Sequence, residues 1–246
     1  MPYENIKEQL GALGFKGMLQ YFDDMVSLKS QEQKWPQLLL SMLKSEASYR
    51  QTRSFMYKLG LAKLPQIKSM DNFDLTDLPI NHETLADANS MKFIEDHYNI
   101  LIIGGSGSGK SHLAISLAHL ALQNNYRIRF YKFAELAREL ITAQSHNYET
   151  AFITKLQRFN LVVIDELGYV PIDPKASPLL FELFSNLYEK VSTIITTHLT
   201  FDEWLNIFGN IKATKAIIDR FTHHCLVLET GNKSWRLREG KNKKTD

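Results

Sequence analysis

The feature that most constrains this chain is a glycine-rich stretch at residues 103–114, IGGSGSGKSHLA, between the apolar run 99–103 (NILII) and an expected helix at 110–124. It contains the complete pattern Gly104-x-x-x-x-Gly109-Lys110-Ser111, for which a chance match in a chain of this length is on the order of one in a hundred. A strand, a loop of this kind and a helix together predict a phosphate-binding loop.

The chemistry expected of this loop follows from its residue types. Glycines let the backbone turn tightly and direct N–H groups at phosphate oxygens, and the positive end of the following helix adds to that field. Lys110 is expected to neutralise the β- and γ-phosphates, and the Ser111 hydroxyl to ligate Mg²⁺. The nucleotide-binding residues predicted in this way are Gly104, Gly105, Ser106, Gly107, Ser108, Gly109, Lys110, Ser111 and His112.

The second half of the chain alternates apolar runs with helical patterns. Runs typical of buried strands occur at 99–103, 127–131, 160–164, 192–196 and 225–228, and the clearest helices between them are 110–124, 133–143 and 176–190. This order predicts an α/β fold with a parallel sheet flanked by helices. No apolar run is long enough to span a membrane and a single cysteine, Cys225, excludes a disulfide framework, so a cytoplasmic protein is expected.

The first part of the chain has a different pattern. Residues 5–60 carry apolar side chains at helical spacing, with breaks expected near Gly14, Gly17 and Pro36. The segment that follows contains Pro65 and Pro79 and has a weaker periodicity. We therefore expect a small all-helical N-terminal domain (1–68), a linker (69–92), an α/β core (93–238) and a basic tail (239–246).

A second catalytic element is expected where the run 161–164 leads into Asp165 and Glu166. Asp165 is predicted to hold the metal and Glu166 to polarise a water molecule toward the γ-phosphate, which favours hydrolysis. The strand 192–196 ends beside these carboxylates and could place Thr197 or His198 near the γ-phosphate, although such residues at a strand end are often a polar loop.

Two pairs of charged or titratable residues lie further on. Arg220, in a helical stretch, could reach the nucleotide of a neighbouring subunit; alone, an Asp-Arg step is more often a surface ion pair. His223 and His224 are interpreted as the polar start of a strand, because adjacent residues on one element cannot easily face a single metal ion.

These motifs form an ordered series: GGSGSGKSHLA, LVVIDELGYVPID, TTHLTFDEW, IIDRFTHHCLVL and SWRLR, preceded by LGFKGML, Glu46-x-x-x-Arg50 and NFDL. The series, which spans nearly the whole chain, resembles the IstB-like transposition helper ATPases of the AAA+ class, relatives of the DnaC-type helicase loaders. The resemblance implies an AAA+ core that binds ATP, assembles as homo-oligomers on double-stranded DNA with ATP at subunit interfaces, and assists a DDE-type transposase.

By motif position, the resemblance makes Gly104, Gly109, Lys110 and Ser111 the Walker A loop, and Asp165 and Glu166 the Walker B carboxylates. It makes Arg220 an arginine that acts on a neighbouring subunit. His198 falls at the first-sensor position, where the family more often has asparagine. This difference puts the sensor function in doubt, although a neutral imidazole can still donate one hydrogen bond.

Charge is distributed unevenly along the chain. Residues 1–70 carry +4 (10 basic, 6 acidic), residues 71–232 carry −6 (13 and 19) and residues 233–246 carry +4 (6 and 2). Basic ends suit a polyanion, but charge alone fits a solvated tail and an ordinary helical surface equally well. With the resemblance, the pattern implies backbone contact with DNA and little base specificity. The predicted DNA-binding residues are Lys44, Arg50, Arg53, Lys58, Lys63, Lys241, Lys243 and Lys244.

Several alternatives remain open at this stage. The N-terminal helices could bind only protein, either the transposase or a second subunit. A DnaC-like loader of a replicative helicase would share the same core. A small-molecule kinase with a phosphate loop would need an arginine-bearing lid and a substrate pocket, neither of which is visible, and a nucleotide-gated scaffold would not depend on Glu166.

Overall fold

The computed structural model describes residues 2–27, 35–70, 73, 78–208 and 211–234. The chain divides into two compact units, Met1–Lys58 and Leu59–Asp246, and the boundary lies inside one long helix, α3 (Trp35–Ala62). Within the described residues, no helix combines the length and the apolar character that crossing a membrane requires.

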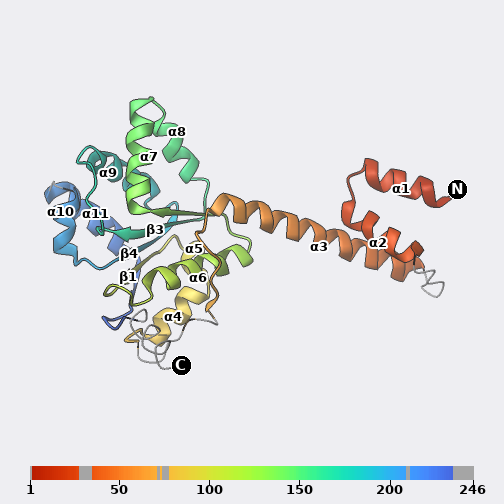
Figure 1. The fold of residues 1–246 in the computed structure, drawn as a ribbon, viewed down its shortest axis with the longest axis horizontal. Helices are drawn as coiled ribbons and strands as arrows, with labels where there is room; N and C mark the ends of the chain where they lie inside the picture. The colour runs from red at the N-terminus through yellow and green to blue at the C-terminus, as the bar shows by residue number, and fades with distance from the viewer. Residues whose placement is uncertain (1, 28–34, 71–72, 74–77, 209–210, 235–246) are drawn as a thin grey trace, which may run out of the picture. The chain divides into compact units, whose positions relative to one another are not determined.

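The first unit contains α1 (Pro2–Ala12), α2 (Lys16–Ser27) and most of α3 (Figure 1). A small core holds them together; its buried members are Leu10, Met18, Phe22 and Met42. Two of the expected breaks coincide with helix starts. Gly17 belongs to the first turn of α2, and Pro36 to the first turn of α3, where a missing N–H costs little.

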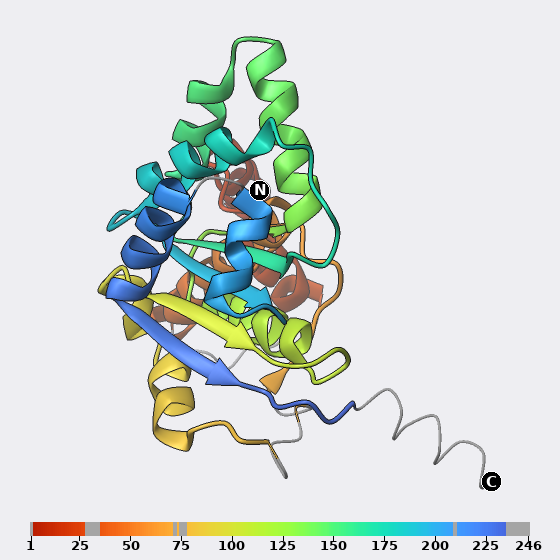
Figure 2. The same ribbon diagram turned by 90° about the vertical axis from the view of Figure 1, so that its left-hand side faces the viewer.

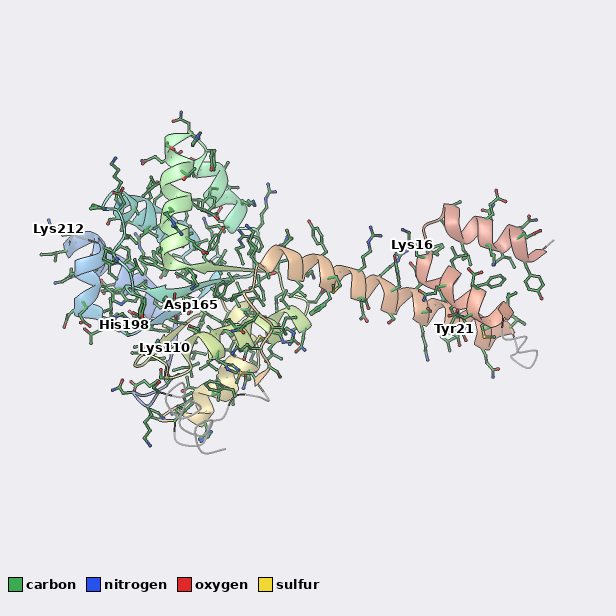
Figure 3. All side chains as sticks on the ribbon, in the orientation of Figure 1. Lys16, Tyr21, Lys110, Asp165, His198 and Lys212 are labelled. Carbon is green, nitrogen blue, oxygen red and sulfur yellow. The ribbon has the colours of Figure 1, made fainter. Side chains whose placement is uncertain are left out.

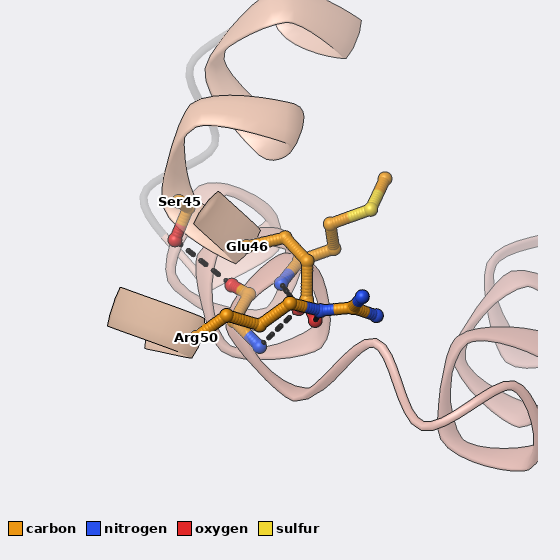
Figure 4. Close-up of polar contacts among 5 residues, drawn as sticks. Ser45, Glu46 and Arg50 are labelled. Atoms are coloured by element: carbon orange, nitrogen blue, oxygen red, sulfur yellow. Dashed lines mark hydrogen bonds and ion pairs between the residues drawn. The ribbon is translucent and has the colours of Figure 1, made fainter. Parts of the chain in front are cut away.

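The contact between α2 and α3 explains why position 17 is a glycine. A Cβ atom there would lie 2.6 Å from the Cβ of Tyr49 and 2.7 Å from the Ser45 carbonyl oxygen, so the helices could not approach as they do. The Ser45 hydroxyl donates to the Gly17 carbonyl at 2.9 Å (Figure 4). Gly17 is therefore a packing residue of the helix pair.

Glu46 of α3 caps the start of α2 (Figure 4). Its Oε2 accepts hydrogen bonds from the backbone N–H groups of Gly17 (2.8 Å) and Met18 (3.2 Å), and its Oε1 accepts from Nε of Arg50 (2.7 Å). These first-turn N–H groups have no partner within their own helix. The hydrogen bond from Arg50 is the largest influence on the pKa of Glu46 and, with the backbone donors, lowers it against the opposing effect of burial.

The second unit contains a five-stranded parallel sheet with the order β2-β3-β4-β1-β5. Its strands are β1 (Asn99–Ile103), β2 (Ile128–Lys132), β3 (Leu161–Leu167), β4 (Ser192–Thr197) and β5 (Cys225–Glu229). Its helices are α4 (His82–Asn89), α5 (Lys92–Glu95), α6 (Lys110–Gln123), α7 (Phe133–Ser145), α8 (Glu149–Leu156), α9 (Ala176–Leu187), the 3₁₀ helix η2 (Phe201–Trp204), α10 (Leu205–Phe208) and α11 (Ile211–His223). The predicted parallel α/β sheet is confirmed.

Helices cover both faces of this sheet. One face packs against α7, α9 and α11 through a continuous apolar cluster that includes Leu101, Val162 and Ile195. On the other side, α6 contacts β1, β3 and β4, and α4 lies beside α6 (Figures 1 and 2). Strands buried on both faces are apolar at nearly every position, which is why the sequence runs were continuous.

The segment expected to be a linker contains a helix. Asn81 caps α4 by accepting hydrogen bonds from the N–H groups of Glu83 (2.8 Å) and Thr84 (3.2 Å). Leu85 and Ala88 of α4 are buried. This part of the chain is therefore packed onto the second unit.

We predict that Glu46→Ala exposes the amides at the start of α2 to exchange. At neutral pH, hydrogen exchange at Gly17 and Met18 should accelerate on the order of tenfold, because their acceptor is lost. Folding lowers the pKa of Glu46 below its ordinary 4.5, so the stabilisation is present above that value and disappears as the pH falls through the folded pKa. Exposed Glu8 on α1 provides the control Glu8→Ala; equal exchange in both variants would contradict the capping role.

Candidate functional site: a phosphate loop beside a buried carboxylate

The phosphate loop connects the end of β1 to the start of α6, at the edge of the sheet where the parallel strands end. Gly109 has φ +98° and precedes the first residue of α6, so the loop turns at a position that favours glycine. Lys110 begins the helix, and its Nζ donates hydrogen bonds to the carbonyls of Gly104 (2.8 Å) and Gly105 (2.7 Å). The ammonium group is thus held over the loop at the N-terminal end of a 14-residue helix.

The segment that follows β5 supports the loop from outside. The Thr230 N–H donates to the Ile103 carbonyl at 2.8 Å, and the Gly105 N–H donates to the Gly231 carbonyl at 2.8 Å. The Thr230 and Ser108 hydroxyls share a buried hydrogen bond of 2.6 Å. A Cβ atom at Gly104 would lie 2.2 Å from Oγ1 of Thr230, so this close approach requires glycine.

Asp165 lies near the end of β3, beside the phosphate-loop helix, and is only 4% exposed. Its Oδ1 accepts hydrogen bonds from Oγ1 of Thr196 (2.5 Å) and from Oγ of Ser111 (2.8 Å). Burial raises the pKa of Asp165, and these two hydrogen bonds oppose that rise. The pair predicted to hold a metal, Ser111 and Asp165, is therefore in contact, and oxygen donors of this kind suit Mg²⁺.

Glu166 is directed away from Asp165 by an irregularity in the sheet. The β3–β4 register pairs Ile164 with Ile195 but Leu167 with Thr197, so Asp165 and Glu166 together oppose the single residue Thr196. Glu166 has φ +64°, and its backbone N–H donates to the Thr196 hydroxyl at 2.9 Å. A bulge of this kind redirects a side chain, and Glu166 lines the cavity described next.

A cavity of about 580 Å³ lies over the loop. Figure 3 shows Lys110, Asp165 and His198 gathered on one side of the unit. The cavity is lined by Gln66, Lys68, Gly105, Ser106, Gly107, Ser108, Gly109, Lys110, Ser111, His112, Glu166, Tyr169, Thr197 and His198. Its size is in the range of small-ligand pockets, and it contains most of the predicted nucleotide-binding residues.

Three other residues that line the cavity, His112, Thr197 and His198, differ in their surroundings. Burial, followed by the nearby charge of Lys68, lowers the pKa of His112, so its imidazole is neutral near pH 7. The Thr197 hydroxyl donates to the Leu167 carbonyl at 2.9 Å, and exposed His198 packs edge-on against Tyr169 with ring centroids 6.0 Å apart. The catalytic roles expected of Thr197 and His198 stay predictions.

Reasoning from the sequence missed two side chains that contact the Asp165–Glu166 pair. Thr196 bonds to both Asp165 and Glu166, whereas the sequence pointed to its neighbour Thr197. Lys132, at the end of β2, places its Nζ 3.4 Å from Oε2 of Glu166. Such a partly exposed ion pair contributes little to stability, but it puts a positive charge beside the carboxylate expected to activate water.

Arg220 lies outside the cavity. It is exposed on α11, donates a hydrogen bond to the Ser185 hydroxyl on α9, and has its guanidinium 5.7 Å from the centroid of the Phe181 ring. Among the predicted DNA-binding residues, Arg50 is bonded to Glu46 and lies 5.4 Å from the centroid of the Phe15 ring. Lys44, Arg53 and Lys63 are exposed and Lys58 is half-buried, while Lys241, Lys243 and Lys244 lie outside the described residues.

Comparison with known proteins gives a consistent result. Residues 8–243 match the model of the family described as IstB-like ATP binding protein. The chain is 32% identical over 246 residues, 99% of this chain and 98% of the relative, to an ATP-binding protein of insertion sequence IS232 from Bacillus thuringiensis subsp. berliner. It is 31% identical to the corresponding IS21 protein of Pseudomonas aeruginosa, over 85% of this chain and 79% of the relative.

Solved structures of AAA+ proteins share the fold. The structure of DnaI aligns with a TM-score of 0.55 at 16% identity, covering 68% of this chain and 95% of DnaI. The DnaC helicase loader aligns with a TM-score of 0.51 at 18% identity, covering 65% of this chain and 96% of the loader. These likenesses concern the fold, whereas the family match and the relatives establish an ATP-binding protein and an ATPase.

We predict that Thr196→Val lowers the ATPase rate roughly 10- to 100-fold, the range seen when the partner of a metal ligand is removed. The change also removes a donor to buried Asp165 and the acceptor of the partly buried Glu166 N–H, which should cost about 1–3 kcal/mol of stability. Steady-state hydrolysis and thermal unfolding measure the two effects. Thr193→Val, a buried position on the same strand, is the matched control, and equal rates in the two variants would contradict the role of Thr196.

We further predict that Asp165→Asn raises Tm by roughly 2–5 °C near pH 7.5 in EDTA. Burial raises the folded pKa of Asp165 above its ordinary 3.8, so folding favours the protonated form. Wild-type stability therefore falls as the pH rises from 3.8 through the folded pKa, and the advantage of Asn should disappear as the pH is lowered across that window. Exposed Asp87→Asn is the control; a variant less stable than wild type at pH 7.5 would contradict the expected penalty.

Proposed function

Because the chain belongs to the IstB-like ATP-binding family, we propose that it hydrolyses ATP as a homo-oligomer on double-stranded DNA, in the cytoplasm. We further propose that this assembly helps the DDE transposase of its own insertion sequence to select and use target DNA. The relatives named as ATP-binding proteins of insertion sequences support the transposition context. The observation that carries the mechanism is the position of Arg220, outside the cavity that holds the phosphate loop.

Each residue of the site has a distinct part in the proposed hydrolysis. The loop N–H groups and Lys110 bind and orient the phosphates, and the start of α6 adds a favourable field for negative charge. Glu166, directed into the cavity, accepts a proton from the attacking water. Ser111 and Asp165 would hold Mg²⁺, which supplies charge neutralisation at the phosphates.

The position of Arg220 supports the proposed homo-oligomer. Its guanidinium packs on α9 and does not line the cavity of its own chain. Hydrolysis at a site of this type gains greatly from an arginine that neutralises the charge of the transition state. We propose that Arg220 supplies this charge to ATP bound by a neighbouring subunit, so that the reaction requires assembly.

Contact with DNA is assigned to the basic residues of the first unit. Lys44 and Arg53 project from α3 as exposed cations, whereas Arg50 is partly neutralised by Glu46. Contacts from flexible lysine and arginine side chains to phosphates carry no sequence information. We therefore propose backbone and shape recognition, with affinity that falls steeply with salt.

A second candidate function, a DnaC-like helicase loader, has one observation in its favour. Helix α3 exposes large apolar side chains, among them Trp35 (74%), Met56 (59%) and Tyr57 (69%). Apolar surface of this kind suits a protein partner better than DNA. A loader would use it to hold a helicase, whereas a transposition helper would use it for the transposase.

We predict that Arg220→Ala abolishes the DNA-stimulated ATPase, lowering the rate by on the order of a thousandfold. In wild type, the rate per subunit should rise with protein concentration and with duplex DNA. Mixing Arg220→Ala with Lys110→Ala should restore part of the activity, because the second variant supplies the arginine to the intact ATP site of the first. Rate measurements on the separate and mixed proteins test this.

Two controls make the result interpretable. Ser185→Ala removes the hydrogen-bond partner of Arg220 within its own chain, and Lys215→Ala removes another exposed cation of α11. Both should retain the wild-type rate within about threefold if Arg220 acts on a neighbour. A rate indifferent to concentration, DNA and Arg220 would contradict the proposal. Preference for single-stranded DNA together with a stable helicase complex would favour the loader.

A further inference from the structure

A second group of possible metal ligands lies apart from the nucleotide site. Glu189, His223 and His224 each bring one ligand atom to within 4.8 Å of the others. Glu189 lies in the turn between α9 and β4, His223 is the last residue of α11, and His224 precedes β5. Figure 2 shows α11 leading into β5 beside the start of β1.

The expectation that adjacent histidines cannot easily face one ion assumed that both lie on one element. Helix α11 ends at His223 and β5 begins at Cys225. The two histidines therefore lie at the turn between a helix and a strand, and not on one regular element. Their ring centroids lie 4.2 Å apart. Asn99 fixes this turn: its backbone N–H donates to the His224 carbonyl at 2.7 Å, and its side-chain amide donates to the Phe221 carbonyl at 3.1 Å.

Two tyrosines restrain the imidazole rings. The Tyr188 hydroxyl lies 3.3 Å from Nδ1 of His223. The Tyr98 ring stacks on His224, with centroids 4.7 Å apart and an interplanar angle of 17°. In metal sites, a hydrogen bond to one ring nitrogen orients the other toward the ion.

We propose that Glu189, His223 and His224 bind a divalent transition-metal ion, with Zn²⁺ best suited to the three donors. Two imidazoles and a carboxylate select such ions over Mg²⁺, which prefers oxygen donors only. Bonds of about 2.1 Å in a tetrahedral arrangement place ligand atoms about 3.4 Å apart. Glu189 and His223 are exposed, so rotation of their side chains closes the remaining gap, and the other coordination positions are left for water.

The proposed ion would connect two elements that also meet through Arg220. Glu189 follows α9 and His223 ends α11, while Arg220, one turn before His223, bonds to Ser185 of α9. A bound ion would fix the end of α11 against the α9–β4 turn. The inference stands on the ligands alone and does not depend on the function proposed above.

The test is a calorimetric titration of the full-length, tag-free protein with Zn²⁺. The buffer contains neither nucleotide nor Mg²⁺. We expect one ion per chain, a rise in Tm with Zn²⁺ concentration, and visible absorption typical of nitrogen ligation when Co²⁺ replaces Zn²⁺. His223→Ala and the shape-conserving Glu189→Gln should each weaken binding by roughly tenfold or more. The matched control is His146→Ala, an exposed histidine at the end of α7.

Each outcome decides the proposal. Binding that is lost in His223→Ala and Glu189→Gln but kept in His146→Ala supports it. Binding that survives in both ligand variants but disappears in Asp165→Asn places the ion at the nucleotide site and overturns it. Wild-type affinity no greater than that of His223→Ala also overturns it. Circular dichroism of each variant confirms that a loss of binding does not reflect unfolding.

Discussion

Burial of the Asp165 carboxylate is the constraint on which the nucleotide site depends. A carboxylate with so little exposure needs hydrogen-bond donors, and it receives them from Thr196 on β4 and Ser111 on α6. These two bonds join a strand and the phosphate-loop helix to β3. The position of the loop relative to the sheet is therefore set by the same group that is proposed to hold Mg²⁺.

The bulge beside Asp165 gives the two carboxylates different surroundings. Two residues of β3 share one partner on β4, so Asp165 stays in the sheet while Glu166 is directed into the cavity. A non-glycine residue at φ +64° costs on the order of 1–3 kcal/mol. The Thr196 hydroxyl offsets this cost by accepting the Glu166 N–H while donating to Asp165. The Thr196 hydroxyl thus holds both residues in place, the buried Asp165 and the partly exposed Glu166.

Much of the site could be predicted from the sequence because its signals are local. The loop pattern, the apolar strands and the Asp165–Glu166 pair each occupy a few consecutive residues. Thr196 could not be separated from Thr197, because the bulge shifts the pairing by one residue and no sequence pattern reports that shift. Lys132 and Thr230 were missed because their partners are set by the strand order, which brings β2 beside β3 and β5 beside β1.

The first unit and the turn before β5 also contain features that could not be predicted from the sequence. Glu46-x-x-x-Arg50 was visible as a pair at helical spacing, but its bonds to the start of α2 depend on how two helices pack. Arg50 was consequently assigned to DNA alone, although it also supports this cap. Helix α4 is short and its periodicity is weak, so only its Asn81 cap distinguished it from a linker. From the sequence, His223 and His224 were placed on one element, whereas α11 ends between them.

The support of the phosphate loop by Thr230 and Gly231 has a consequence for the order in which the protein matures. The loop is synthesised near the middle of the chain, but some of its hydrogen bonds come from a segment made more than a hundred residues later. Domains generally begin to fold during synthesis from the N-terminal side. A nascent chain can therefore form its helical first unit early, while the nucleotide site waits for β5 to complete the sheet. Incomplete chains released before Thr230 would then lack these hydrogen bonds to the phosphate loop.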